Sequence, residues 1–286
     1  MADGIVPAVQ AEQTVAQLVP VAHSLMPYLL DQTHLVRAAR ACMRRGASPG
    51  ADGLTWAEYR DGMRSRLTAL AARIRRQEWS PSPLRTVDIT SYTGKTFQAV
   101  IPTVEDRIVH RAIRGALEPI LEHRVLADWV SAYRPGRNRV TAVRQASRHI
   151  DAGNRWVADI DVAGASVGGT AEQFVDWLTP HVADGSFLAV FRTVLEGLPT
   201  PLIPGSGLGP SLLHLRLAQV DQHLDALVVR FADNYTAFAP DRDAAMTAFG
   251  QITDALASIG LRPNTRKSAI RPPHLANPED LFLIDG

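Results

Sequence analysis

Two stretches that lie far apart in the sequence carry the carboxylates best suited to chemistry. Asp161 stands near the end of an alternating run at 156–162, and Asp233 stands between two apolar runs at 226–240. We expect the second stretch to form a β-hairpin whose two-residue turn is Asp233-Asn234. A carboxylate that projects from a hydrophobic sheet is costly unless something binds it, and a divalent metal is the usual partner. Ordinary turn chemistry is the alternative, because Asp and Asn also favour turns that bind nothing.

The run at 156–162 offers two aspartates on the same side of one strand. A strand alternates its side chains between two faces, so Val157, Asp159 and Asp161 share one face. The alternate positions, which include Ile160 and Val162, share the other face and are apolar. Asp159 and Asp161 are therefore rival candidates for a metal ligand.

Composition narrows the class of protein. The chain has 286 residues, of which 46% are hydrophobic, enough for one large domain or two closely packed ones. A single cysteine excludes a disulfide framework and a thiolate zinc site. No apolar run is long enough to cross a bilayer, and the N-terminus lacks the pattern of a signal peptide. We therefore expect a cytoplasmic protein without a membrane partner.

The formal net charge of +1 hides an asymmetry along the chain. Residues 31–150 contain 21 Lys and Arg against 11 Asp and Glu, whereas the remaining residues contain 9 against 18. A basic half joined to an acidic half suggests that one part holds a polyanion while the other carries metal or acid chemistry. The alternative is that the arginines are only the solvated faces of helices.

Hydrophobic periodicity predicts the elements that must position these residues. Strands are expected at 85–90, 96–101 and 156–162, on both sides of the Asp233 turn, and after Lys267, with a turn at Thr93-Gly94-Lys95. Helices are expected at 19–30, 35–45, 56–77, 104–123, 140–150, 171–178, 186–196, 211–224 and 241–259.

Several short motifs follow one another in a fixed order. They are Ile101-Pro102-Thr103 with Asp106-Arg107-Ile108-Val109, then Leu117-Glu118-Pro119-Ile120, Arg134-Pro135-Gly136-Arg137, Phe231-Ala232-Asp233-Asn234, and Asn264 with Lys267. This collinear series resembles the reverse transcriptases, in particular the group II intron and bacterial class, over roughly residues 33–286. Each motif alone is weak, and the specificity lies in their order.

The resemblance implies an α+β fold of the right-hand polymerase type. It implies a leader at 1–33, a basic fingers-like domain at 34–150, and a palm-like domain at 151–286 with a ferredoxin-like sheet packed on helices. The family places its primer-grip hairpin where this sequence ends, at Phe282-Leu283-Ile284, so we expect no thumb. A protein partner or a second copy of the chain would then supply it.

The resemblance also assigns the chemistry of the acidic half. It implies two Mg²⁺ ions, with Mn²⁺ as a substitute, that activate a primer hydroxyl and stabilise the leaving diphosphate. Asp161 and Asp233 would be the catalytic metal ligands, and the Val162 carbonyl would complete the nucleotide-side site. Asp161 is preferred to Asp159 because the residues after it match the family register. Asn234 stands where the family has a second aspartate, and its amide oxygen can still ligate Mg²⁺.

Other positions follow the family less closely. Lys95, Ser166, Gly205 and Lys267 fall where nucleotide-binding residues are expected, and Arg107, Arg134 and Arg137 fall where phosphates of a nucleic acid are contacted. Phe97 and Ser91 replace residues that normally grip the triphosphate, so Lys95 would have to take that role or is a solvated turn lysine. Ser166 replaces an aromatic residue that excludes a ribose 2′-hydroxyl.

Two functions are consistent with these observations. The first is a weakly processive RNA-directed DNA polymerase that uses an RNA or DNA template-primer and nucleoside triphosphates. The second is a reverse-transcriptase fold that no longer polymerises and serves as a small-molecule enzyme or as a nucleic-acid-binding or partner-binding protein. The altered triphosphate ligands and Asn234 favour the second function, whereas Asp161, Asp233, Lys267 and the basic half favour the first.

Overall fold

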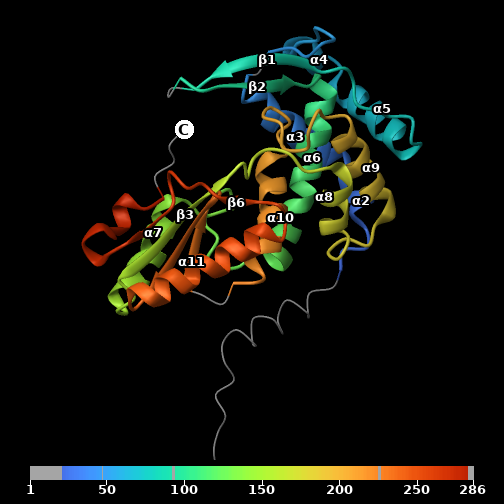
Figure 1. The fold of residues 1–286 in the computed structure, drawn as a ribbon. Helices are drawn as coiled ribbons and strands as arrows, with labels where there is room; N and C mark the ends of the chain where they lie inside the picture. The colour runs from blue at the N-terminus through green and yellow to red at the C-terminus, as the bar shows by residue number, and fades with distance from the viewer. Residues whose placement is uncertain (1–20, 47, 92–93, 225–226, 283–286) are drawn as a thin grey trace, which may run out of the picture.

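The computed structural model describes residues 21–46, 48–91, 94–224 and 227–282 (Figure 1). Most of the predicted leader at 1–33, Thr93 of the predicted turn, Ala226, and the last residues of the chain lie outside these ranges. Within them no helix combines the length and the apolar composition that a bilayer crossing requires.

The fold is mixed α+β, with strands that pair antiparallel. The helices are α2 Leu25–Leu29, α3 Gln32–Met43, α4 Trp56–Arg60, α5 Met63–Arg75, α6 Val104–Ile120, which a π-helical turn Leu121–Val125 extends, α7 Arg139–Asp151, α8 Ala171–Leu178, α9 Gly185–Glu196, α10 Gly209–Asp221 and α11 Arg242–Ala257. The strands are β1 Arg85–Thr90, β2 Thr96–Ile101, β3 Trp156–Ala163, β4 Leu227–Phe231, β5 Asn234–Ala239, β6 Arg262–Pro263 and β7 Ala269–Arg271.

The expected helix at 56–77 is wrong in one respect, because the structure divides it. Thr55 begins α4 with a capping box, in which its hydroxyl accepts from the Glu58 N–H and the Glu58 carboxylate accepts from the Thr55 N–H. Asp61 is extended, and Gly62 takes a φ of +69° before α5 begins. The glycine makes this break inexpensive, since a residue with a Cβ rarely adopts that conformation. The apolar period continues across the break, which is why the sequence pattern did not show it.

Two sheets organise the chain (Figure 1). The first is the ribbon of β1 and β2, which pair from Arg85 opposite Ile101 to Thr90 opposite Thr96 and match the predicted strands. The second has the strand order β4-β5-β3-β6, with β7 also paired to β3. Along the outer edge of β4 the segment 129–131 adds a short parallel bridge, in which Arg230 N–H donates to Trp129 C=O at 3.0 Å and Ser131 N–H donates to Arg230 C=O at 2.9 Å.

The predicted alternation of β3 is confirmed, because its two faces belong to different apolar clusters. Val157 packs with residues of β4, β5 and α7, among them Val229, Phe238 and Ala146. Ile160 on the opposite face packs with the main cluster, which includes the apolar side of α11. Helices α7 and α11 therefore cover opposite faces of the sheet, and Asp159 and Asp161 lie on the face that carries α7 (Figure 1).

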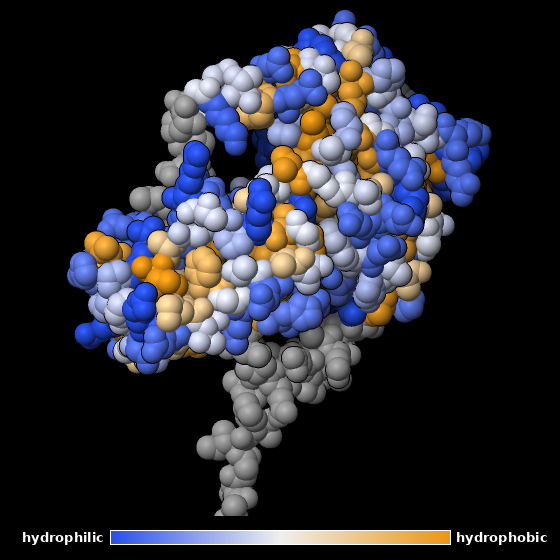
Figure 2. Space-filling view, in the orientation of Figure 1, coloured by the Kyte–Doolittle hydropathy of each residue, from blue (hydrophilic) through white to orange (hydrophobic). Residues whose placement is uncertain are grey.

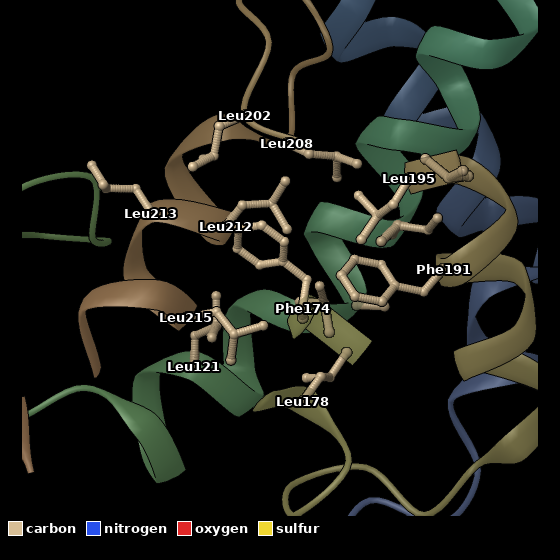
Figure 3. Close-up of a cluster of buried hydrophobic side chains, with 14 of the residues drawn as sticks. Leu121, Phe174, Leu178, Phe191, Leu195, Leu202, Leu208, Leu212, Leu213 and Leu215 are labelled. Atoms are coloured by element: carbon tan, nitrogen blue, oxygen red, sulfur yellow. The ribbon is translucent and has the colours of Figure 1, made fainter. Parts of the chain in front are cut away.

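The main apolar cluster lies between the helices and the second face of the sheet. Figure 3 shows its centre, where α8, α9, α10 and the end of α6 converge on Phe174, Phe191 and Leu212. This cluster joins residues from both sides of the predicted domain boundary at 150/151. Helix α7, from the predicted fingers-like part, covers the sheet, whereas α9, from the predicted palm-like part, contacts α2 (Figure 1). The two parts thus share elements and one core.

A glycine loop ties the helical part to the β1–β2 ribbon. Pro204 C=O accepts from the Val100 N–H at 2.8 Å, and Gly205 follows with a φ of +98°. A Cβ built on Gly205 would lie 1.9 Å from the Val100 carbonyl oxygen, a contact that no side chain tolerates. Gly207 has a φ of +79° but has open space where its Cβ would stand.

Gly205→Ala should therefore lower the free energy of unfolding by about 3 kcal/mol or more, because backbone strain and overpacking add at one position. Gly207→Ala is the matched control and should cost only ~1–2 kcal/mol, since strain acts there without a clash. Urea unfolding of the two variants measures the difference. Equal losses would contradict the close packing of the loop on β2.

Candidate functional site

A cleft of about 680 Å³ opens at the end of the five-stranded sheet, where β3, the β4–β5 turn and the segment after β6 meet. Figure 2 shows the molecule hollowed between the β1–β2 ribbon and the sheet, with hydrophilic side chains along the border. Ionisable groups of both signs line the cleft: Asp159, Asp161, Asp233 and Asp280, together with Lys95, Arg266, Lys267 and Arg271. The cleft is therefore suited to a polar, charged ligand.

The hairpin that carries Asp233 differs by one residue from the expected one. The turn is Ala232-Asp233, and Asn234 is the first residue of β5, where it pairs with Phe231. Ala232 takes the left-handed conformation with a φ of +56°, a position that Gly or Asn would occupy more readily. The predicted turn at Asp233-Asn234 is therefore wrong in register, although Asp233 still lies at the tip.

The structure brings Asp161 and Asp233 together. The Cα of Asp161 lies opposite that of Asn234 in the β3–β5 register, and the Val162 N–H donates to the Asp233 C=O at 3.2 Å. Burial raises the pKa of Asp233, and the charge of Asp161 raises it further, as expected for two carboxylates that lie near each other. Their catalytic role stays a prediction.

The two aspartates of β3 have different surroundings. Asp159 is 5% exposed and forms an ion pair with Arg271 of β7, with an Nη2–Oδ2 distance of 2.6 Å. Burial raises its pKa, and Arg271 acts against that rise. The Asp161 side chain is 26% exposed, and the nearest cation is Lys267, with an Nζ–Oδ2 distance of 3.8 Å. Asp161 is therefore the aspartate available to a ligand, whereas Asp159 is held by a structural partner.

The Asn234 side chain lies among the carboxylates of the cleft and favours the ionised form of Asp159. Its side chain lies on the face of Asp159 and acts with Arg271 to oppose the rise in the pKa of Asp159. Its Oδ1 also accepts from the Thr236 hydroxyl at 3.4 Å. An aspartate at this position would face the carboxylates of Asp159 and Asp161 in a partly buried site, which costs free energy through like-charge repulsion. We interpret Asn234 as a residue that positions Asp159 rather than as a catalytic one.

Four further predicted residues line the same cleft. Val162 N–H points toward the hairpin, and because N–H and C=O of a strand residue share one side, its carbonyl lies on that side too. Lys95, Ser166 and Lys267 are exposed and line the cleft from the ribbon, the loop after β3 and the segment after β6. The structure therefore brings the predicted nucleotide-binding residues together, except for Gly205.

Gly205 and Arg107 lie in a second cavity, away from the aspartates. That cavity has a volume of about 370 Å³ and is formed by α3, α6 and the loop 205–207. The lining of the aspartate cleft contains neither residue. The expectation that Gly205 supports a nucleotide beside Asp161 is thus not matched by its position.

Arg134 is a correction. Its side chain is 2% exposed, its Nε and Nη2 donate to both carboxylate oxygens of Glu122, and its Nη1 donates to the carbonyls of Ala127 and Val130. Four of its five N–H donors are occupied and the side chain is buried, so we assign Arg134 a structural role. Arg137 is partly exposed and pairs with the Asp128 carboxylate at 2.7 Å, which offsets its charge.

A buried polar network holds the hairpin in place. Arg230 of β4 is fully buried, donates from Nε and Nη2 to the two Asp221 oxygens at 3.1 and 2.7 Å, and donates from Nη1 to the Ala232 carbonyl at 3.0 Å. Tyr235 Oη donates to Asp221 at 2.7 Å. Burial disfavours the charged guanidinium, but Asp221, Tyr235 and Asp233 together outweigh burial and raise the pKa of Arg230. One arginine therefore links α10, β4 and the left-handed residue before Asp233.

Two residues next to segments that line the cleft were not anticipated from the sequence. Arg216 of α10 donates from Nη1 to the carbonyls of Ala165 and Val167 at 3.0 and 2.6 Å, and so fixes the loop that carries Ser166. Tyr133 lies near enough to the hairpin that the charge of Asp233, after burial, raises its phenol pKa. Their partners are distant in sequence or are backbone atoms, so no local motif marks them. The R-P-G-R motif beside Tyr133 was the nearest signal.

The donor set fits a divalent metal of the Mg²⁺ type. No group of three or more His, Cys, Asp or Glu in the described ranges is arranged to hold an ion by itself. Asp161, Asp233 and the Val162 carbonyl are hard oxygen donors, and Mg²⁺ is commonly held by one or two carboxylates together with water and substrate phosphates. A cation here would also offset the repulsion between Asp161 and Asp233, which adds to the effect of burial in raising the pKa of Asp233.

Arg230→Met should lower the free energy of unfolding by about 3–5 kcal/mol, because it leaves the Asp221 carboxylate buried without its charge partner. The double variant Arg230→Met/Asp221→Leu should recover most of that loss, since it removes both charges together. Chemical denaturation of the three proteins at neutral pH measures both effects. A double variant as unstable as the single one would contradict the assignment.

The raised pKa of Asp233 makes the stability of the folded protein depend on pH. Since the folded-state pKa is raised above its ordinary value of 3.8, the folded protein binds this proton more tightly than the unfolded chain. The ionised carboxylate thus costs stability at neutral pH. With EDTA present, Asp233→Asn should melt at a higher temperature than the wild type at pH 7. The difference in melting temperature between the two proteins should disappear as the pH falls through the raised pKa toward 3.8.

Thermal melts from pH 3.5 to pH 8 test this expectation. The exposed Asp176→Asn, outside the cleft, is the matched control and should follow the wild type at every pH. A pH-independent difference in melting temperature, or an Asp233→Asn protein that is less stable at pH 7, would show that the ionised Asp233 carboxylate does not destabilise the folded protein.

Comparison with known proteins adds one similarity in sequence. No protein-family model matches the chain. Protein YkfC of Escherichia coli (strain K12) is 27% identical over 223 residues, which cover 70% of this chain. The chain spans 56% of the length of that relative. The name of this relative states no activity.

Proposed function

We propose that this chain is a metal-dependent nucleotidyltransferase of the reverse-transcriptase type, which extends a primer on an RNA or DNA template. The observation that carries the proposal is the meeting of Asp161 and Asp233 at the open end of the sheet. The two carboxylates come from separate strands and face a charged cleft of about 680 Å³. Such a pair is the minimal protein contribution to phosphoryl transfer assisted by divalent ions.

In this proposal some residues of the cleft bind the metal ions and others keep the strand in position. Asp161 and Asp233, with the Val162 carbonyl, hold the ions. Bound Mg²⁺ would supply charge stabilisation for the attacking and leaving oxygens of the transferred phosphoryl group. Asp159, locked by Arg271, keeps the strand in register and is not a ligand.

The cations of the cleft suit a triphosphate. Lys267 and Arg266 follow β6, and Lys95 comes from the ribbon across the cleft. Phosphate oxygens lying between these segments would meet positive charge from two sides. Lys95 therefore replaces the grip that Phe97 cannot provide, and Lys267 is placed to hold Asp161 or a phosphate.

The arrangement of the sheet is in keeping with a polymerase palm. The central strands β3 and β5 bring their acidic ends to one edge, α11 packs beneath them, and the β1–β2 ribbon projects over the cleft (Figure 1). In the proposed assignment this ribbon belongs to the fingers. The exposed Ser166 leaves space beside the nucleotide, so ribonucleotides would be accepted with less discrimination than an aromatic residue would impose.

A second candidate function has its own supporting observation. Phe282 and Asp280 line the cleft, and the Phe282 ring packs against Phe231 with a centroid distance of 6.2 Å. A cleft narrowed in this way suits a small phosphorylated molecule better than a duplex. The non-polymerising alternative therefore predicts that nucleoside triphosphate binds without primer extension.

Primer extension with Mg²⁺ or Mn²⁺ on RNA and DNA templates tests the proposal. The wild type should extend the primer, and Asp161→Asn or Asp233→Asn should lower the rate by at least about 100-fold, because each removes a charged metal ligand. Asp176→Asn, an exposed substitution of the same kind outside the cleft, should retain wild-type activity.

The outcomes separate the two candidate functions. Extension that survives Asp233→Asn would show that the cleft does not catalyse it. Triphosphate binding that is sensitive to Lys267→Gln, without extension on any template, would favour the small-molecule alternative. Absence of both extension and triphosphate binding would rule out nucleotide chemistry in this cleft.

A further inference from the structure

The second cavity is lined by arginines in a way that the aspartate cleft does not explain. It lies between the end of α3, the middle of α6 and the loop 205–207, and its volume is about 370 Å³. Its lining contains five arginines: Arg44, Arg45, Arg107, Arg111 and Arg114. We propose that this cavity binds a compact phosphate anion with two or more negative charges, either free diphosphate or the terminal phosphate of a nucleic-acid strand.

The charges of this cavity are not neutralised by direct ion pairs among the described residues. None of its five arginines forms an ion pair in the described part of the chain, whereas five other arginines of the basic half do: Arg73, Arg76, Arg134, Arg137 and Arg139. Burial lowers the pKa of Arg114, and the charges of Arg111 and Arg45 lower it further, while Glu118 acts in the opposite direction. The guanidinium groups thus repel one another around a shared space, which an anion would relieve.

Arg107 is already held in position for binding. Its Nη2 donates to the Ser48 carbonyl at 2.9 Å, and its guanidinium lies 5.2 Å from the centre of the Trp56 ring. Its Nη1 is buried and has no partner in the described part of the chain. The Arg107 guanidinium is held through Nη2, while its Nη1 has no acceptor among the described residues. Because the side chain is already ordered, it loses little conformational entropy when an anion binds.

The glycine loop supplies the third wall. The buried His110 ring is bonded through Nδ1 to the Ser206 carbonyl at 2.7 Å, which holds the loop against α6. The backbone N–H groups of Gly205 and Gly207 donate to no acceptor in the described ranges. Backbone N–H groups of a turn that have no acceptor within the fold can donate to an anion.

Size and charge density select the class of ligand. Arginine pairs with phosphate through two parallel N–H···O bonds, and several arginines around one volume favour charge concentrated in that volume. A diphosphate or a terminal phosphate carries this charge in a compact group, whereas an internal phosphodiester carries one charge and continues along a strand. The inference does not rest on the polymerase proposal, because the residues of this cavity are separate from the aspartates.

Inorganic diphosphate is the first probe, with EDTA present so that no metal complex forms in the aspartate cleft. Isothermal titration calorimetry on the full chain should show binding that exceeds the effect of chloride at equal ionic strength. Arg111→Gln/Arg114→Gln should weaken it at least about tenfold, since two charge-assisted contacts are lost. Arg64→Gln/Arg144→Gln removes the same charge from exposed positions outside the cavity and should leave the affinity unchanged.

Oligonucleotides distinguish the two sources of phosphate. Tighter binding of a 5′-phosphorylated strand than of the same strand with a 5′-hydroxyl, lost in Arg111→Gln/Arg114→Gln, would identify a strand terminus, whereas equal binding of both strands alongside tight diphosphate would identify the free anion. If the double variant does not fold, the exposed Arg45→Gln takes its place. Diphosphate that binds no better than chloride, or equally well to the cavity and control variants, would overturn the proposal.

Discussion

The position of the candidate site depends on one buried ion pair. Arg230 and Asp221 lie in the core with nearly complete hydrogen bonding, and the same guanidinium caps the carbonyl of Ala232. Because Ala232 is held in a left-handed conformation, Asp233 projects from the hairpin toward Asp161. A buried pair of this kind contributes less to stability than a well-packed apolar pair would, but it specifies one arrangement, since any other leaves a charge unpaired. Here that arrangement sets the spacing of two carboxylates on neighbouring strands.

The charged side chains of the cleft are of two kinds: some are fixed by a structural ion pair, and others are available to a ligand. Asp159 and Arg271 neutralise each other beneath Asn234, while Asp161 and Asp233 keep part of their repulsion and Lys267 stays at 3.8 Å. The carboxylates of Asp161 and Asp233 thus lie beside an ion pair whose two charges neutralise each other. A site that exchanges ions and phosphates needs both features. The rigid ion pair keeps the neighbouring ligands in position, and the carboxylates without a full charge partner attract the cation.

Much of the local structure could be predicted from the sequence, because it depends on local patterns. The bounds of β1 and β2 and the two faces of β3 follow from period-2 alternation and turn residues. The pairing of the acidic end of β3 with the hairpin was expected from the family resemblance and not from a local pattern. The position of the turn could not, because Ala232 is an unusual residue for a positive φ and is held there by Arg230. Arg134 was assigned to phosphate because its motif is basic, while its partner Glu122 is not part of that motif. The arginine cavity also required the structure, since α3, α6 and the loop 205–207 meet only in the fold.

The short parallel bridge beside β4 has a consequence for association between molecules. Both peptide groups of Arg230 that face outward are occupied by Trp129 and Ser131, and Arg134 braces that segment through the carbonyl of Val130. An uncovered strand at this border would offer its amides to a neighbouring molecule and seed aggregates. The segment 129–131, braced by Arg134, therefore covers this part of the sheet edge and opposes pairing between copies of the protein along β4.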